Sequence, residues 1–142
     1  MIDIVLDMDP PRATAQGKRI NRKTGAVFHS PEYLAAAQEY ALRLSREREK
    51  WCRQHPLPLP GGVSCCVTFT FPTRRGKDFG KPKTTRPDLD NMLKCVLDEL
   101  TKAGYWYDDA QVCFLLAEKK WAKVGSVEIE ISDYMPDGGE TR

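Results

Sequence analysis

The strongest constraint on the fold is a run of alternating apolar and polar side chains at residues 63–71, VSCCVTFTF. Because successive side chains of a strand point to opposite sides, the run predicts a β-strand with one face in the core. Its apolar face consists of Val63, Cys65, Val67, Phe69 and Phe71, and its other face of Ser64, Cys66, Thr68 and Thr70. Such a strand is stable only beside other strands and beneath a covering layer, which the rest of the chain must supply.

Other segments also have the pattern of strands. Apolar residues alternate in IDIVLD, residues 2–7, and in SVEIEISDY, residues 126–134. The segment VCFLLAEKKWAK, residues 112–123, is predicted to be a further strand, and a short strand is expected near GAVFHS, residues 25–30. With residues 63–71, these segments predict a sheet of four to five strands.

Two segments carry the signals of helices. Ser30, Pro31 and Glu32 supply a capping hydroxyl, a first-turn proline and a first-turn acid, which predict a helix over about residues 31–53. A second helix is predicted to begin near Asp88 and to stop at Gly104. The expected buried stripes are Leu34, Ala37, Ala41, Leu44 and Trp51 on the first helix, and Leu89, Met92, Leu93, Val96, Leu97 and Leu100 on the second.

The order of these elements predicts an α+β fold, because strands and helices mix without a repeating βαβ rhythm. We expect a single small domain in which a mixed or antiparallel sheet of four to five strands packs with two main helices. The 142 residues fit one domain, which we place at residues 1–134. The remaining segment, MPDGGETR at residues 135–142, is predicted to be a disordered tail.

Composition excludes several classes of protein. No apolar run approaches the ~18 residues that a membrane span needs, and the acidic N-terminus lacks the pattern of a signal peptide, so we expect a cytoplasmic protein without a membrane partner. The five cysteines form no CxxC pair, which argues against a disulfide scaffold or a zinc site. His29 and His55 are isolated in the sequence, and a histidine-based catalytic or metal cluster has little support.

The positive charge is concentrated in two stretches, although the formal net charge is only +2. Residues 12–23, RATAQGKRINRK, contain five bases and no acid, and residues 74–86, RRGKDFGKPKTTR, contain six bases and one acid. This distribution fits a positive surface on one side of the molecule that could bind nucleic acid. It fits equally well a pair of solvated, mobile loops.

Carboxylates gather at the start of the second helix, where Asp88 and Asp90 are separated by one residue. An ordinary structural role would explain much of this pattern. Asp88 suits the cap position, Asp90 gains from the helix dipole, and Lys94 lies four residues after Asp90, the spacing of a stabilising ion pair. Acids at the start of a helix are common, so the pair alone does not identify a metal site.

The surroundings of these acids strengthen the metal hypothesis. Asp108 and Asp109 follow the helix after the aromatic turn GYWYDD, and a returning chain could bring one of them beside the first pair. The basic stretch of residues 74–86 also runs directly into the acids. Bases attract phosphate and clustered carboxylates repel it unless a cation intervenes, so the combination is expected where Mg²⁺ is held against a phosphodiester.

The central segment resembles a known signature. RPDLDNMLKCVLDELTKAGYWYDDAQV, residues 86–112, is similar to the core pattern of the RusA family of Holliday junction resolvases. That pattern is an acid-x-acid-Asn, a lysine four residues on, an Ala-Gly-aromatic turn, and Asp-Asp-x-Gln-Val. A weaker similarity covers PPRATAQGKRINRKTGAVFHSPEY near the N-terminus, and the order of elements along the chain also fits.

The resemblance implies a set of site residues. Asp88, Asp90 and Asp109 would be catalytic ligands of Mg²⁺, with Mn²⁺ as a possible substitute, and Lys94 would steady the scissile phosphate. Asn91 and Asp108 would have secondary roles. Phosphate contacts would come from the two basic stretches, through Arg12, Lys18, Arg19, Arg22, Lys23, Arg74, Arg75, Lys77, Lys81, Lys83 and Arg86.

The resemblance also implies a function. Members of the family are bacterial or phage-encoded homodimers with an α+β fold, and their two sites nick opposed strands of a four-way DNA junction during recombination and repair. Two alternatives stay open. One is a non-catalytic protein that binds branched DNA, and the other is a nuclease of the same family that prefers other branched DNA, such as replication forks or displacement loops.

Overall fold

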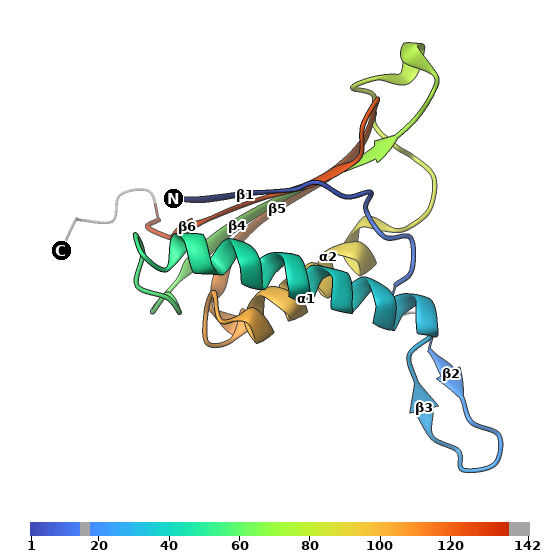
Figure 1. Ribbon diagram of the computed structural model, residues 1–142, viewed down its shortest axis with the longest axis horizontal. Helices are drawn as coiled ribbons and strands as arrows, with labels where there is room; N and C mark the ends of the chain where they lie inside the picture. The colour runs from blue at the N-terminus through green and yellow to red at the C-terminus, as the bar shows by residue number, and fades with distance from the viewer. Residues whose placement is uncertain (15–17, 137–142) are drawn as a thin grey trace.

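The computed structural model describes residues 1–14 and 18–136, and residues 137–142 of the predicted tail lie outside the described residues. Two long helices lie against one face of a twisted sheet, and a short two-stranded hairpin projects from the body (Figure 1). The elements in chain order are β1 (Ile2–Leu6), β2 (Arg19–Ile20), β3 (Val27–Phe28), α1 (Pro31–Trp51), β4 (Val63–Pro72), η2 (Gly76–Asp78), α2 (Leu89–Ala103), η3 (Asp109–Gln111), β5 (Val112–Ala122) and β6 (Ser126–Asp133).

The main sheet has four strands in the order β1-β6-β4-β5. β6 pairs antiparallel with both β1 and β4, whereas β4 and β5 are parallel. Parallel neighbours need a long crossover connection, which α2 supplies here. The prediction of one α+β domain with a mixed sheet and two main helices is therefore confirmed, and β2 and β3 form a separate two-stranded sheet.

The core lies between the helices and the apolar face of the sheet. Ile4 pairs with Ile129, which pairs in turn with Val67, so one row of β-branched side chains crosses three strands. The alternation predicted for residues 63–71 is observed, since every apolar residue of that face is at most 1% exposed. The inward-facing side chains of β1, β4 and β6 are Ile2, Ile4, Leu6, Val63, Cys65, Val67, Phe69, Phe71, Val127, Ile129 and Ile131.

The buried stripe of α1 differs from the predicted one. Leu34, which we expected in the core, is 49% exposed, and Ala37, Ala41 and Trp51 are only partly buried. The core-facing residues are Tyr33, Ala36, Tyr40 and Leu44. The helix is thus rotated by about one position, which buries the large rings of two tyrosines in preference to smaller side chains.

α2 follows the sequence prediction more closely. It ends at Gly104, whose φ of 87° is a left-handed conformation that favours glycine. The buried side chains are Met92, Leu93, Cys95, Val96, Glu99 and Leu100, and Leu89 and Leu97 lie at the edges of the stripe. Within the described residues, no helix has the length and apolar character needed to cross a bilayer.

Two leucines on α1 provide a test of this packing. Leu44 is fully buried, whereas Leu42 is 51% exposed on the other side of the same helix. Leu44→Ala should lower the free energy of unfolding by about 2–5 kcal/mol, because it leaves a cavity in the core. The matched change Leu42→Ala should cost less than about 0.5 kcal/mol. Urea denaturation of both variants measures the difference, and equal losses would contradict the observed rotation of α1.

Candidate active site

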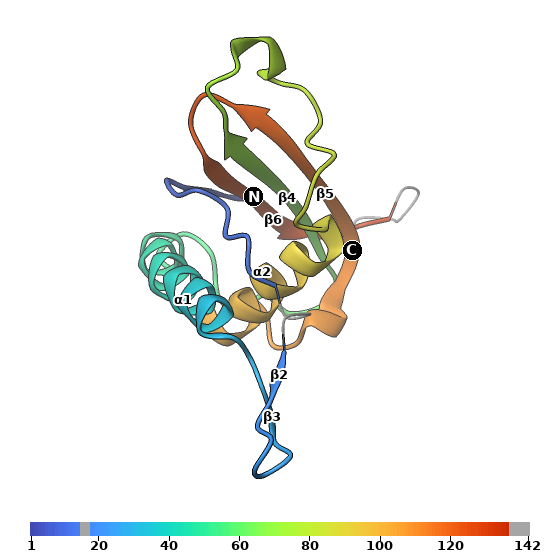
Figure 2. The same ribbon diagram turned by 90° about the vertical axis from the view of Figure 1, so that its right-hand side faces the viewer.

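The first turn of α2 lies between the two basic stretches. The loop that carries η2 projects from one end of the molecule and the β2–β3 hairpin from the other, and both lie on the side where α2 begins (Figures 1 and 2). A strand or duplex that contacted both projections would therefore pass the start of α2. This arrangement agrees with the predicted one-sided positive surface.

Asp88 occupies the N-cap position of α2, as predicted, but its carboxylate makes no capping hydrogen bond. Asp88 and Asp90 are both exposed, and Asn91 is half-buried beside them. In the described part of the chain, no ion pair joins Asp90 to Lys94, so that expected structural pairing is absent. Both carboxylates are thus free to bind a ligand. A purely structural role would instead have used Asp88 for capping and Asp90 for an ion pair.

A small pocket of about 190 Å³ opens beside Asp88. Its lining combines two guanidinium groups with an amide, a hydroxyl and one carboxylate: Arg12, Thr14, Arg86, Pro87, Asp88 and Asn91. The first backbone N–H groups of a helix are free to bind an anion unless a side chain caps them, and here Asp88 does not. The pocket therefore offers several donors to a phosphate next to a carboxylate that can bind a cation.

Charged residues continue from the pocket along one side of α2. Lys94 lies one turn beyond Asp90, and Asp98 lies one turn further, because residues four apart share a side of a helix. Lys94 is exposed, so its ammonium group is accessible from solvent. The separation of Asp90 and Asp98 along the helix axis is about 12 Å at 1.5 Å per residue.

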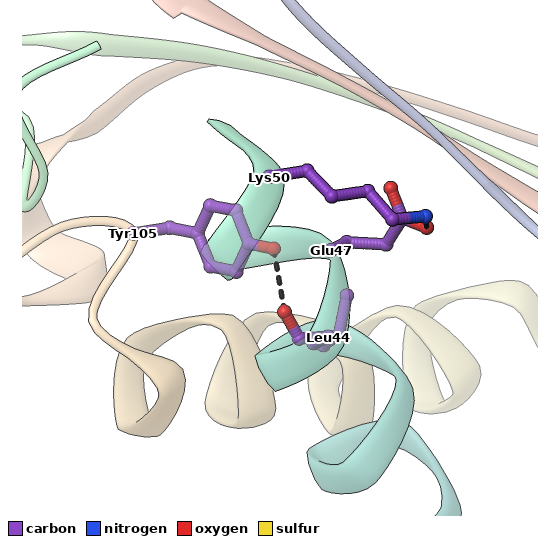
Figure 3. Close-up of polar contacts among 4 residues, drawn as sticks. All are labelled: Leu44, Glu47, Lys50 and Tyr105. Atoms are coloured by element: carbon purple, nitrogen blue, oxygen red, sulfur yellow. Dashed lines mark hydrogen bonds and ion pairs between the residues drawn. The ribbon is translucent and has the colours of Figure 1, made fainter. Parts of the chain in front are cut away.

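The turn after α2 is anchored to α1. The Tyr105 hydroxyl donates to the carbonyl oxygen of Leu44 at 2.7 Å, and the ring is fully buried (Figure 3). Arg48 donates to the carbonyl oxygen of Gly104 at 3.2 Å. Trp106, also buried, donates through Nε1 to Thr101 on α2 at 2.7 Å. Tyr105 and Trp106 are therefore packing anchors that fix where the following aspartates emerge, whereas Tyr107 is 70% exposed.

Asp108 has a structural role in this turn. It is the N-cap of η3, and its Oδ1 accepts from the backbone N–H of Ala110 at 3.0 Å. Gln111 completes the arrangement, since its Oε1 accepts from the N–H groups of Tyr107 and Asp108 at 2.7 and 3.0 Å. The Gln111 Nε2 donates to the carbonyl oxygens of Leu59 and Gly61 at 2.8 and 2.9 Å. This amide, whose role we did not predict, uses all its hydrogen-bonding groups to hold the turn.

Asp109 is exposed, and the acids that act on its pKa are Asp108 and Asp98. Hydrogen bonding to the Asp108 carboxyl, slight desolvation and the negative charges of Asp108 and Asp98 raise the pKa of Asp109 above its usual value. Within residues 1–14 and 18–136, no three His, Cys, Asp or Glu side chains lie close enough to hold one metal ion. Asp88, Asp90 and Asp109 therefore do not form a three-ligand group in the single chain.

Most of the predicted phosphate contacts are exposed on the two projections. Lys18, Arg19, Arg22 and Lys23 belong to the β2–β3 hairpin, and Arg74, Arg75, Lys77 and Lys81 to the η2 loop. Arg12 and Arg86 line the pocket at Asp88.

Lys83 was predicted to contact a DNA phosphate, and its position in the structure does not agree with that role. Its side chain is 2% exposed, and its ammonium group donates to Thr85 and Arg86 within the protein. A buried ammonium group whose three hydrogens are already used cannot also contact a DNA phosphate.

Comparison with known protein families identifies the class of protein. A family model described as Endodeoxyribonuclease RusA matches residues 10–132, which include the hairpin, both basic stretches, α2 and the turn after it. An enzyme of this class cuts within DNA strands, which agrees with free carboxylates between two basic projections.

Individual relatives agree with that match. The chain is 32% identical over 130 residues to the crossover junction endodeoxyribonuclease rusA of Lactococcus phage r1t, covering 89% of this chain and 94% of the relative. It is 43% identical over 68 residues to RusA of Escherichia coli K12 and to rusA of Enterobacteria phage 82, covering 47% of this chain and 57% of each relative. The chain therefore belongs to the RusA family of crossover junction endodeoxyribonucleases, which confirms the resemblance of residues 86–112.

The role of Gln111 can be tested directly. Gln111→Leu should lower the free energy of unfolding by about 1–3 kcal/mol, because the four hydrogen bonds that hold the turn disappear. Gln38→Leu, at an exposed position of α1, is the matched control and should change stability little. Chemical denaturation reports both values. A neutral Gln111→Leu would mean that the turn is held by its aromatic anchors alone.

Proposed function

We propose that this protein is a Mg²⁺-dependent endonuclease of the bacterial cytoplasm that resolves four-way DNA junctions by paired, symmetric nicks. The observation that carries the proposal is the uncapped Asp88–Asp90 pair between two basic projections. Membership of the RusA family supports the same conclusion, and the names of the relatives specify the crossover junction as their substrate.

The donor set at the start of α2 fits Mg²⁺ in one common mode of binding. Mg²⁺ is usually held by one or two carboxylates together with substrate phosphates and water, and seldom by a cage of protein ligands alone. Asp88 and Asp90 would supply the two carboxylates, and Mn²⁺ would suit the same oxygen ligands. A bound ion would polarise the phosphoryl oxygen and help to generate the attacking hydroxide. Asp109 remains a proposed third ligand, although the single chain does not group it with the pair.

The remaining side chains of the site act on the DNA strand. Arg12 and Arg86 would bind the backbone phosphate in the pocket beside Asp88 and hold it against the carboxylates. Asn91, on the same wall, would orient the phosphate or a ligand of the cation. Lys94, one turn along α2, would stabilise negative charge that develops on the phosphate during cleavage. Each of these roles places a polar or charged group where charge appears in the reaction.

A homodimer follows from the symmetry of the substrate. Resolution of a four-way junction requires two opposed nicks, and one chain offers one site. A two-fold symmetric pair would present two identical sites to two opposed strands. We therefore propose that the active species is a dimer.

Two other functions remain as alternatives to the proposal. A non-catalytic protein could grip branched DNA through the same basic projections, and a nuclease of the same chemistry could prefer forks or displacement loops. Retention of the uncapped acid pair with Lys94 favours a catalytic protein over a non-catalytic one. The preferred branch structure is decided by comparing cleavage of a four-way junction, a fork and a displacement loop.

The central test is Asp90→Asn. The variant should bind a synthetic four-way junction with near wild-type affinity, because it removes no cationic group. Its nicking rate with Mg²⁺ should fall on the order of 100-fold or more, since the carboxylate charge at the reacting centre is removed. Gel-shift and single-turnover nicking assays measure the two properties. Wild-type cutting by Asp90→Asn would refute the catalytic assignment, and a wild-type protein without metal-dependent nicking would favour the binding-only alternative.

The hairpin provides a test of the DNA surface. Arg22→Ala combined with Lys23→Ala should weaken junction binding and reduce the slope of log K against log salt by about 0.9 for each phosphate that the hairpin no longer neutralises. The control pair is Lys50→Ala with Arg53→Ala, because Lys50 lies in the last turn of α1 and Arg53 just after the helix, at the end of α1 that is far from the hairpin. Binding titrations at several salt concentrations distinguish the two. Equal effects of both pairs would show that the hairpin makes no specific contact with DNA.

A further inference from the structure

Lys83 is buried although it belongs to an exposed basic loop. Its Nζ lies 4.8 Å from the ring centre of Trp121 and 4.9 Å from that of Phe71. Burial, together with the nearby charges of Arg12 and Lys119, lowers the pKa of Lys83. An ammonium group is costly to bury, so its surroundings must stabilise it by cation–π contact and hydrogen bonds.

The hydrogen bonds of Lys83 all go to the segment just before α2. Its Nζ donates to the backbone oxygen of Thr85 at 3.1 Å, to the hydroxyl of the same residue, and to the backbone oxygen of Arg86. An ammonium group has three hydrogens, so its donor capacity is fully used.

A second lysine holds the same segment from the sheet. Lys119 lies on β5, and its Nζ donates to the backbone oxygens of Thr85 and Pro87, each at 2.6 Å. β5 is paired with β4 along its length, so Lys119 extends from a rigid strand. The η2 loop is also tied to β5, because the N–H of Lys83 donates to the carbonyl oxygen of Lys119 and that of Trp121 donates to Lys81.

Residues 84–87 need this support because the backbone gives them little. In the described chain no backbone–backbone hydrogen bond involves this segment, and the first one after it joins Met92 to Asp88. Three successive carbonyl oxygens, those of Thr85, Arg86 and Pro87, are instead held by lysine side chains. Asp88 and Asp90 follow within a few residues, so their positions depend on where this segment is fixed.

We propose that Lys83 and Lys119 form a two-lysine clamp that fixes residues 85–87 and thereby positions Asp88 and Asp90 for cleavage. Both are positioning residues, because their ammonium groups bind the protein backbone and do not contact the reacting phosphate. The inference rests on the proposed nuclease function and adds a second role for charge in the basic loop. Lys81 faces solvent and would bind DNA, whereas Lys83, two residues later, would orient the acids.

The test uses methionine, which fills a volume similar to that of lysine and removes the ammonium group. Lys83→Met should lower the single-turnover nicking rate at saturating protein by at least about 10-fold, because small displacements of catalytic groups are costly. Its affinity for the junction should stay within about 3-fold of wild type, since the charge that it removes is buried. Lys81→Met, on the same loop, should instead weaken binding. Lys120→Met, beside Lys119 and ion-paired with Glu118, should change neither property.

Hydrogen exchange provides a readout that does not depend on cleavage. Lys83→Met and Lys119→Met should both increase deuterium uptake at residues 92–95, because the first protected amide of α2, that of Met92, donates to the carbonyl oxygen of Asp88 directly after the clamped segment. Lys120→Met should leave this uptake unchanged. If Lys83→Met does not fold, Lys119→Met tests the same segment from a less buried position. Wild-type exchange and nicking in the clamp variants would overturn the proposal, as would weakened binding with an unchanged rate for Lys83→Met. Failure of the wild-type protein to nick would instead refute the proposed function, while hydrogen exchange would still test the clamp.

Discussion

The parallel pairing of β4 with β5 requires the chain to cross the sheet between them, and α2 is the element that crosses. The site residues follow from this constraint, because they lie just before, along and just after the crossover helix. Asp88 and Asp90 are placed where the chain enters α2, and Asp108 and Asp109 where it leaves. The apolar stripe of α2, buried against the sheet, fixes the helix and hence both groups of acids.

The two ends of α2 are fixed by different means. Before the helix, the ammonium groups of Lys83 and Lys119 bind backbone oxygens that have no backbone partner. After it, Tyr105 and Gln111 tie the turn to α1 and to residues 59–61. In both places, side chains supply hydrogen bonds to backbone groups of an irregular segment. Such groups need these partners because no helix or sheet satisfies them.

Charged residues of one type serve different purposes here according to their surroundings. Asp88 and Asp108 both occupy N-cap positions, but only Asp108 caps, so Asp88 keeps its carboxylate free. Lys81 and Lys83 lie two residues apart, and one is exposed while the other is enclosed by two aromatic rings. The residue type is the same within each pair. What differs is the local geometry that surrounds the side chain.

The sequence by itself determined the strands of the main sheet, the two long helices, the α+β class and the family, because alternation, helix signals and the signature of residues 86–112 are local properties of the chain. It also located the pair of acids at the start of α2, and the structure then showed that Asp88 does not cap the helix. Only the tertiary structure decided the rotation of α1, the parallel pairing of β4 and β5, the burial of Lys83 and whether Asp88, Asp90 and Asp109 form one group, which in the single chain they do not. These features depend on contacts between residues that are far apart in the sequence. A local sequence pattern does not contain the packing and solvation energies of such contacts.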